Sequence, residues 1–348
     1  MPASGISGKI VEQMRGRAGE LLRNGSVTRV LGWEKGEFCY DQTPAFFDSE
    51  SELNGLVYDG FSAAMLSKYL INATKNAKDK EKSKILVFLK PCDTYGLNLL
   101  LKEHRVERSK IYAVGVGCSG LLDINKIKAR LAKNTKNVKS VDESGSDVVV
   151  HTSDGSQTLT RRDVLLEKCL SCKCKKGEFM LQDEALEPQE LPFKTEDRFA
   201  RVAELEAMTP ENRFTFWRGE LSRCIRCNAC RNACPVCSCN SCVFDNPRSG
   251  VASKASADSF EENMFHIVRA FHVAGRCSDC GECSRVCPQN IPLHLLNRKL
   301  IKDIDEFYGS FQAGADIEAK SPLTDYKKGD AEPGVFGKSK AGKRGGVA

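Results

Sequence analysis

Uninterrupted apolar runs of strand length mark the first half of the chain. The runs ILVFL at 85–89 and IYAVGV at 111–116 contain no polar break, as in strands that are covered on both faces. Shorter segments at 27–32, 45–47 and 138–142 predict further strands. We therefore expect a sheet whose central strands are buried.

Apolar residues at helical spacing lie between these runs. The segments 65–73, 94–106 and 124–131 each predict a helix. Strands that alternate with helices predict an α/β domain with a parallel sheet and right-handed crossovers. The Asp154-Gly155 pair predicts a hairpin that closes this part of the chain.

The second half has a helical pattern. Helices are predicted in the segments 197–208, 211–223 and 260–275, and a last one begins at Pro292, because proline is favoured in the first turn. No strand pattern follows residue 165. We expect an α/β domain at 1–182, a proline-containing linker at 183–197, an α-helical domain at 198–310 and a flexible tail at 311–348.

Cysteine content narrows the class of protein, since the 348 residues include 17 cysteines. No apolar run approaches the ~20 residues that cross a bilayer, so no membrane span is expected. The N-terminal residues lack the apolar core of a secretory signal. We expect a cytoplasmic protein, in which clustered cysteines bind metal more often than they form disulfides.

Charge adds little to this picture. The net charge is +6, and four positive charges lie in the last twelve residues, at Lys338, Lys340, Lys343 and Arg344. No basic stripe with interleaved aromatic residues accompanies them, so nucleic acid is not an expected partner.

A motif of four cysteines followed by proline occurs twice, as CIRCNACRNACP and CSDCGECSRVCP. Three cysteines separated by two residues wrap one corner of a cubane, and the fourth ligates the other cluster of a pair. Two 4Fe–4S clusters are predicted. The first has the ligands Cys224, Cys227, Cys230 and Cys287, and the second has Cys277, Cys280, Cys283 and Cys234.

Structural zinc is the alternative for these cysteines. Zinc sites usually take two separated pairs of ligands, not two triplets that are each followed by Cys-Pro, so we favour clusters. The motifs are separated by residues 235–276, and this stretch ends in a predicted helix. The arrangement resembles the α-helical ferredoxins of fumarate-reductase-type iron–sulfur subunits and of heterodisulfide reductase.

Three more cysteines, Cys237, Cys239 and Cys242, follow the first motif directly. They could belong to another site, or shield the first cluster with thiols. They could also be buried small apolar residues, and we favour this interpretation because no fourth ligand is evident.

A third site is predicted in the first half. Cys92 and Cys118 each follow a predicted strand, and parallel neighbouring strands would place both at the carboxyl edge of one sheet. A short loop adds Cys169 and Cys172, which makes four thiolates, with Cys174 as a spare ligand. The alternative is a set of buried free cysteines. Cys39 is interpreted as an ordinary thiol.

The segment KPCDTYGLNLLLKEHRVERSKIYAVGVGCSGLLD, with the later KCLSC, is similar to the beta subunits of deazaflavin-reducing hydrogenases and related formate dehydrogenases. The resemblance covers roughly residues 25–180. It implies that Cys92, Cys118, Cys169 and Cys172 bind a cluster, and that FAD beside it exchanges hydride with a deazaflavin or nicotinamide. In the hydrogenase subunits the ferredoxin segment comes first, whereas here it follows, as in beta-like subunits of heterodisulfide-reductase-type complexes.

The same region contains a competing pattern. Gly115, Gly117 and Gly120 spell G-x-G-x-x-G after a strand, and Asp142 ends the next candidate strand. This is the fingerprint of a dinucleotide site. Cys118 lies where a pyrophosphate would approach, so we favour a tight turn instead.

These features predict an iron–sulfur electron-transfer subunit of an anaerobic oxidoreductase complex, with no catalytic residue of its own. Its partners would be flavin, formate dehydrogenase, hydrogenase or heterodisulfide-reductase-like subunits. The first alternative is an FAD-containing subunit that itself oxidises or reduces a deazaflavin or NAD(P)H. The second is an adaptor structured by zinc.

Overall fold

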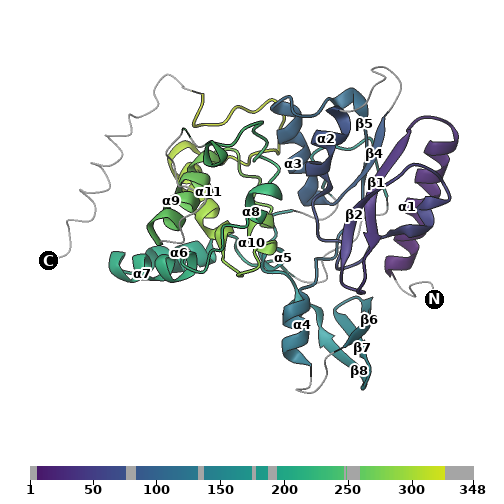
Figure 1. Cartoon of the computed structure of the whole chain (residues 1–348), viewed down its shortest axis with the longest axis horizontal. Coiled ribbons are helices and arrows are strands. Elements are labelled where there is room, and N and C mark those ends of the chain that lie inside the picture. Colours follow the sequence, from purple (N-terminus) through teal and green to yellow (C-terminus); the bar gives the residue numbers. More distant parts are fainter. Residues whose placement is uncertain are drawn as a thin grey trace.

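The computed structural model describes residues 6–75, 84–131, 137–174, 178–186, 194–246, 248 and 259–325. An α/β half and a helical half lie side by side (Figure 1). The main sheet has the order β2-β1-β4-β5-β9, and β3 also pairs with β1. Its strands are β1 (Arg29–Lys35), β2 (Gln42–Phe47), β3 (Leu56–Val57), β4 (Ile85–Leu89), β5 (Ile111–Gly115) and β9 (Glu184–Ala185).

The centre of this sheet is parallel, which confirms the α/β prediction. β1 pairs parallel with β4, β4 with β5, and β5 with β9, whereas β2 and β3 pair antiparallel with β1. All five residues of β4 are buried. The apolar run at 85–89 therefore forms a central strand that is covered on both faces.

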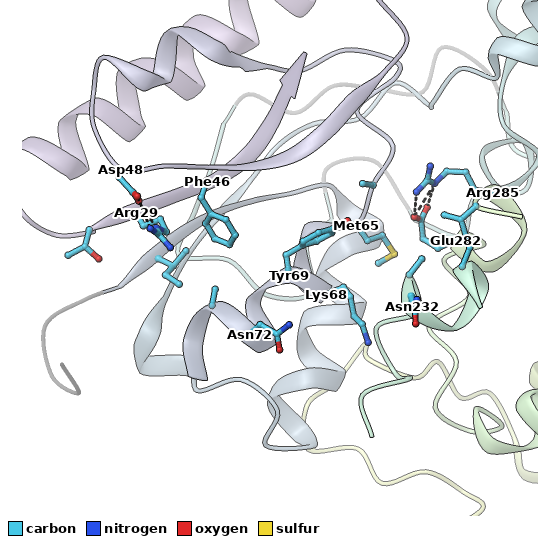
Figure 2. Close-up of a pocket in the computed structure, with 17 residues that line it drawn as sticks. Arg29, Phe46, Asp48, Met65, Lys68, Tyr69, Asn72, Asn232, Glu282 and Arg285 are labelled. Atoms are coloured by element: carbon cyan, nitrogen blue, oxygen red, sulfur yellow. Dashed lines mark hydrogen bonds and ion pairs between the residues drawn. The ribbon is translucent and has the colours of Figure 1, made fainter. Parts of the chain in front are cut away.

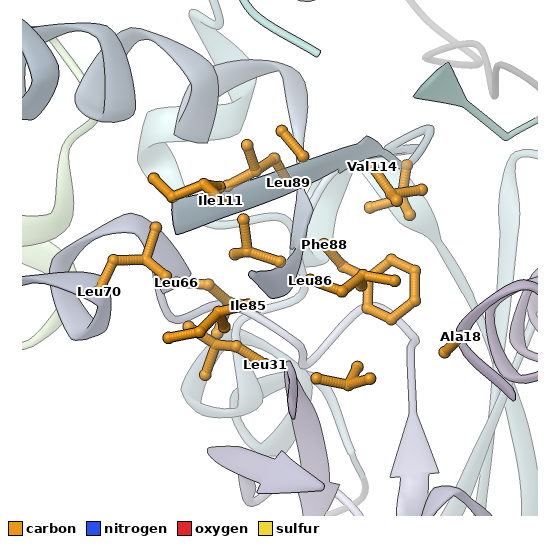
Figure 3. Close-up of a cluster of buried hydrophobic side chains, with 14 of the residues drawn as sticks. Ala18, Leu31, Leu66, Leu70, Ile85, Leu86, Phe88, Leu89, Ile111 and Val114 are labelled. Carbon is orange, nitrogen blue, oxygen red and sulfur yellow. The ribbon is translucent and has the colours of Figure 1, made fainter. Parts of the chain in front are cut away.

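Helices cover both faces of the sheet. Figure 3 shows Leu66 and Leu70 on one side of β4, and Ala18 of the first helix on the other. All three side chains are buried in one apolar cluster. The helices of this half are α1 (Ile6–Arg23), α2 (Leu70–Lys75) and α3 (Pro91–Lys102), with 3-10 turns at Glu52–Gly55, Leu66–Tyr69 and Arg108–Lys110.

Two sequence predictions in this half need correction. The helix expected over 65–73 is instead a 3-10 turn that continues into the short α2. The strand expected at 138–142 is β6 (Val138–Ser144), which belongs to a separate antiparallel sheet, not to the parallel one. Its polar residues alternate toward solvent, and such a pattern suits a sheet with one open face.

The smaller sheet contains the predicted hairpin. β7 (Asp147–Thr152) pairs with β6 and with β8 (Gly155–Thr160), and the Asp154-Gly155 turn joins β7 to β8. The buried face packs with Ile127 of α4 (Ile124–Arg130) in a second apolar cluster. This unit projects from the lower edge of the main sheet in Figure 1. A 3-10 turn at Arg161–Val164 follows β8.

The segment expected as a linker begins inside the main sheet. β9 pairs with β5, and Asp183 accepts a hydrogen bond from the Ala113 amide at 2.7 Å. The prediction of no strand after residue 165 is therefore wrong. β9 has only two residues, so tertiary contact forms it and no periodic pattern marks it.

The helical half follows the predicted pattern. α7 is capped by the Thr209 side chain, and α11 begins directly after Pro292. Among the described residues, no helix has the length and apolar content to cross a bilayer. The helices are α5 (Glu167–Leu170), α6 (Ala200–Ala207), α7 (Pro210–Leu221), α8 (Ala229–Asn232), α9 (Ser259–His272), α10 (Glu282–Arg285) and α11 (Leu293–Tyr308), with a 3-10 turn at Val243–Asp245.

Part of the predicted tail is an ordered strap on α3. The Asn98 side chain donates to the Gly314 carbonyl at 2.9 Å, and Lys102 donates to the Ala319 carbonyl. Ala313 and Ser321 are buried. The expectation of a flexible tail is therefore wrong for residues 311–325, and residues 326–348 lie outside the described residues.

Candidate metal centres

The two ferredoxin motifs fold in the same way. Two positions after its first cysteine, each motif has a residue with positive φ, Arg226 at 53° and Asp279 at 54°. Two residues later, Asn228 and Gly281 also have positive φ, at 62° and 69°. A left-handed residue other than glycine costs about 1–2 kcal/mol and persists only where the surroundings impose it.

Each turn aims an amide at a thiol. The amide of Arg226 donates to Cys224 Sγ at 3.4 Å, and the amide of Asp279 donates to Cys277 Sγ at the same distance. A four-residue helix, α8 or α10, follows each turn. The motifs are therefore a structural repeat whose backbone wraps the space that the cysteines enclose.

The first set of thiols lines one cavity. Its walls include Phe265, Ile291 and Leu293, so the cavity is largely apolar. The fourth thiol that lines it comes from the second motif. The cysteines that line this cavity are Cys224, Cys227, Cys230 and Cys287.

The second set of thiols lines a neighbouring cavity, and here too one thiol comes from the other motif. Asn297 donates from its side-chain amide to Cys283 Sγ at 3.7 Å, and Arg269 lines the same cavity. Here the fourth thiol comes from the first motif. The cysteines that line this cavity are Cys234, Cys277, Cys280 and Cys283.

These donor sets suit a cluster in two respects. Burial raises the pKa of the Cys280 thiol to about 11 and that of Cys283 to about 12, so both hold a proton at neutral pH unless a metal replaces it. Among the described residues, no three His, Cys, Asp or Glu side chains converge on a single ion. Four thiols around one cavity are the usual ligand set of a 4Fe–4S cluster.

The four thiols of the predicted third site lie near one another. Cys92 lies just after β4 and Cys118 just after β5, so both are at the carboxyl edge of the sheet as expected. Cys172 is close enough to raise the pKa of both thiols, in each case added to the larger effect of burial. Cys169 accepts from the Leu121 amide at 3.3 Å and is influenced by Cys118 and Cys172. The structure therefore brings all four predicted thiols together.

The remaining cysteines differ from one another. Cys174 shares a hydrogen bond with Cys172, which lowers the pKa of Cys172 to about 6 and places Cys174 beside the third site. A hydrogen bond with Cys234 lowers the pKa of Cys237 to about 7. Cys237 is thus a thiol packed against the second set, whereas Cys239 is exposed, so burial does not explain it.

Two further cysteines are not among the residues that line the two ferredoxin cavities. Cys242 interacts with Arg231. The Cys39 thiol contacts the Val138 carbonyl at 3.8 Å, in keeping with an ordinary thiol.

Sequence reasoning missed a buried cation between the two ferredoxin cavities. Arg269 is 4% exposed and donates to the Cys230 carbonyl at 3.1 Å, while its Nε has no hydrogen-bond partner. Its spacing of four residues from Phe265 and from Val273 was the available signal, because an arginine in an apolar stripe is unusual. His266, on the same helix, lines the first cavity, and burial lowers its pKa to about 3.

The dinucleotide fingerprint lacks its acidic partner. Asp142 lies on β6 of the separate sheet and bonds to His151 at 2.8 Å, so it does not end a strand beside β5. A Cβ atom on Gly115 would come within 2.9 Å of the Phe179 ring. Packing therefore accounts for this glycine without a nucleotide.

A groove of about 1,070 Å³ separates the two halves. Figure 2 shows Lys68 and Tyr69 on its α/β side and Glu282 and Arg285 on its ferredoxin side. The cations that line it already have partners. Arg29 pairs with Asp48, Arg285 with Glu282, and Lys68 donates to the Cys237 carbonyl at 2.6 Å.

Two family models match parts of this chain. Residues 82–242 match the family described as the C terminus of the coenzyme F420 hydrogenase/dehydrogenase beta subunit, and residues 220–291 match the 4Fe-4S dicluster domain. A relative in Methanocaldococcus jannaschii, F420-dependent formate dehydrogenase subunit beta, is 21% identical over 81% of this chain and 86% of its own length. F420-dependent formate dehydrogenase 1 subunit beta of Methanococcus maripaludis is 24% identical over 87% and 90%.

A solved structure was also matched, the F420-reducing [NiFe] hydrogenase complex from Methanosarcina barkeri. The TM-score is 0.37 at 13% identity, over 49% of this chain and 64% of that one. The expected resemblance is confirmed by the family matches, together with the assignment to iron–sulfur electron transfer. Over residues 82–242 the chain is therefore similar to the coenzyme F420 hydrogenase/dehydrogenase beta subunit family, and over residues 220–291 it is similar to 4Fe–4S dicluster domains.

Proposed function

We propose that this chain is the iron–sulfur beta subunit of an F420-dependent formate dehydrogenase or hydrogenase type of complex, and that it relays single electrons. The observation that carries the proposal is the reciprocal exchange of Cys234 and Cys287 between the two ferredoxin cavities. Two clusters held in this way are fixed close to each other. The names of the two relatives support the class of complex.

The chain would hold three 4Fe–4S clusters, and each cluster supplies one-electron redox chemistry when bound. The ligand sets are the three groups of four thiols described above. The protein's own part is to hold the thiols in place, to exclude water with apolar walls, and to donate hydrogen bonds toward sulfur. The Asn297 side chain and the amides of Arg226 and Asp279 are such donors.

FAD is the second cofactor that the resemblance implies, and the groove between the halves is large enough to be considered as its site. Arg29 and Arg285 are paired with the carboxylates of Asp48 and Glu282, so only Lys68, which donates to the Cys237 carbonyl, brings an unneutralised positive charge to face the two negative charges of a flavin diphosphate. For this reason the residues that line the groove do not fit FAD. We therefore assign no step to FAD, and an FAD-containing oxidoreductase is the less favoured function.

The domain limits and partners are part of the same proposal. The α/β unit would extend to β9, and the dicluster unit would include the strap at 311–325 that returns to α3. The partner would be a subunit that oxidises formate or hydrogen, in the reducing cytoplasm that free thiols require.

A reductive titration of the anaerobically purified full chain tests the function. Three one-electron centres predict an uptake of about three electrons per chain, with no flavin released on denaturation. Uptake of about five electrons with one flavin per chain would support the alternative subunit instead. NADH alone should not reduce the centres, whereas dithionite should.

A further inference from the structure

The loop that carries Cys169 and Cys172 lies against the second ferredoxin motif. Lys168 and Glu282 form an ion pair in which the side chains are only 7% and 1% exposed. Lys168 directly precedes Cys169, and Glu282 directly precedes Cys283. One buried contact thus joins a neighbour of a third-site ligand to a neighbour of a second-cluster ligand.

A second buried contact joins the same two segments. Arg298 of α11 binds Asp279 through Nε at 2.7 Å and donates to the Ser171 hydroxyl at 2.7 Å. Arg298 is 2% exposed. Ser171 lies between Cys169 and Cys172, and Asp279 lies between Cys277 and Cys280. The guanidinium therefore bridges two ligand loops that are more than a hundred residues apart along the chain.

The backbones also approach closely here. A Cβ atom on Gly281 would lie 2.5 Å from the Cβ atom of Lys168. Glycine at this position therefore serves both the left-handed turn, with φ at 69°, and the approach of the third-site loop. The loop that carries Cys169 and Cys172 therefore lies in close contact with the loop of the second ferredoxin motif.

The equivalent positions of the first motif face elsewhere. Arg226 corresponds to Asp279, and its guanidinium lies over the Phe265 ring of α9 at 4.2 Å. Ala229 corresponds to Glu282 and has no charge to pair with Lys168. The first cavity is walled by α9 and by residues around Ile291.

We propose that the second cluster, held by Cys277, Cys280, Cys283 and Cys234, is the obligatory link between the third site and the first cluster. Lys168, Glu282 and Arg298 are positioning residues that fix the distance between the third site and the second cluster. When bound, the clusters would exchange single electrons along this order, and no bond would be made or broken. This order deepens the proposed function and rests on it.

Electron paramagnetic resonance of the fully reduced, anaerobically reconstituted chain tests this order, because neighbouring reduced clusters broaden each other's signals. Cys287→Ser, which disrupts the first cluster, should leave broadened signals from the second and third. Cys280→Ser, which disrupts the second, should leave narrow, non-interacting signals from the first and third. Broadening that persists in Cys280→Ser, or is lost in Cys287→Ser, would overturn the order.

Cys280→Ser could prevent the ferredoxin domain from folding, so Cys92→Ser provides the reciprocal measurement. Loss of the third cluster should narrow the second cluster's signal and leave the first cluster's unchanged, and a change in the first cluster's signal instead would overturn the order.

Glu282→Gln should weaken the broadening between the second and third clusters, with the exposed Glu196→Gln as the matched control. A wild-type chain without a third-cluster signal would overturn both this order and the three-cluster function. If all three cluster signals are present but the broadening connects the first and third clusters directly, the proposed order is wrong and the three-cluster function stands.

Discussion

Lys90 and Asp93 form an ion pair at 3.1 Å in which neither side chain is exposed, and they flank the third-site residue Cys92. Lys90 also donates to the carbonyls of Ser62 and Ala64 at 3.1 and 3.0 Å. The two carbonyl bonds tie Lys90, at the start of α3, to the loop at 62–64. They therefore fix the backbone that presents Cys92.

Lys90→Met should destabilise the fold by about 3–5 kcal/mol, because it leaves the carboxylate of Asp93 buried without its cation. Denaturant unfolding of the anaerobic protein measures the loss. The double variant Lys90→Met/Asp93→Leu removes both charges and should recover most of the stability. Equal stabilities for the single variant and the wild type would show that the pair is not structurally important.

The crossed ligands give a prediction for cysteine variants. Cys287→Ser and Cys227→Ser should alter the signal of one cluster, although the residues belong to different motifs, because both line the first cavity. Cys234→Ser and Cys280→Ser should alter the signal of the other cluster. Electron paramagnetic resonance during stepwise reduction distinguishes the two signals. If Cys234→Ser and Cys227→Ser instead affect the same cluster, each motif binds its own cluster and the crossing is wrong.

Gly281→Ala should destabilise the ferredoxin half. The left-handed φ of 69° costs alanine about 1–2 kcal/mol, and the new methyl group would lie 2.5 Å from the Lys168 Cβ atom. Gly219→Ala in α7 is the control, since nothing lies within 4 Å of its added Cβ atom. It should stabilise the protein by roughly 0.5–1 kcal/mol through helix propensity. Thermal unfolding of both variants measures the difference, and a Gly281→Ala variant as stable as Gly219→Ala would refute the close approach.

Asp59 gives a pH dependence. Burial raises its pKa to about 7, and nearby Glu143 adds to the rise. Because the folded pKa lies above the unfolded value of about 3.9, the folded state keeps a proton that the unfolded state has lost. The stabilisation from this proton is complete at about pH 4 and disappears as the pH rises through 7.

Between pH 6 and 8 the wild type should therefore lose about 1.4 kcal/mol of unfolding free energy relative to Asp59→Asn. Asp154→Asn, in the exposed β7–β8 turn, is the control and should follow the wild type. Parallel pH profiles for the wild type and Asp59→Asn would contradict the prediction.

The sequence allowed prediction of features with a local signature. The apolar run at 85–89 and the Cys-x-x-Cys spacings each lie within a dozen residues, so neighbouring positions in the sequence are enough to identify them. The strand at 138–142 was also identified, but its pairing partner was not. The pattern of a single strand does not show which sheet the strand will join.

The contacts between distant segments were not predictable in the same way. Lys168 and Glu282 are 114 residues apart. In the sequence, each residue taken by itself predicts a charge that is exposed to solvent. Arg298 donates to the Ser171 hydroxyl, 127 residues away, and only the folded chain brings the two together. These contacts place the third site beside the second ferredoxin motif, and they depend on the packing of the two halves.

The count of iron and acid-labile sulfide in the anaerobically purified chain tests the central claim most directly. Three 4Fe–4S clusters predict about twelve irons and about twelve sulfides per chain. The matched variant Cys92→Ser should contain about eight of each, because only the third site is lost. Zinc without sulfide would contradict the clusters altogether, and about eight irons in the wild type would contradict the third site.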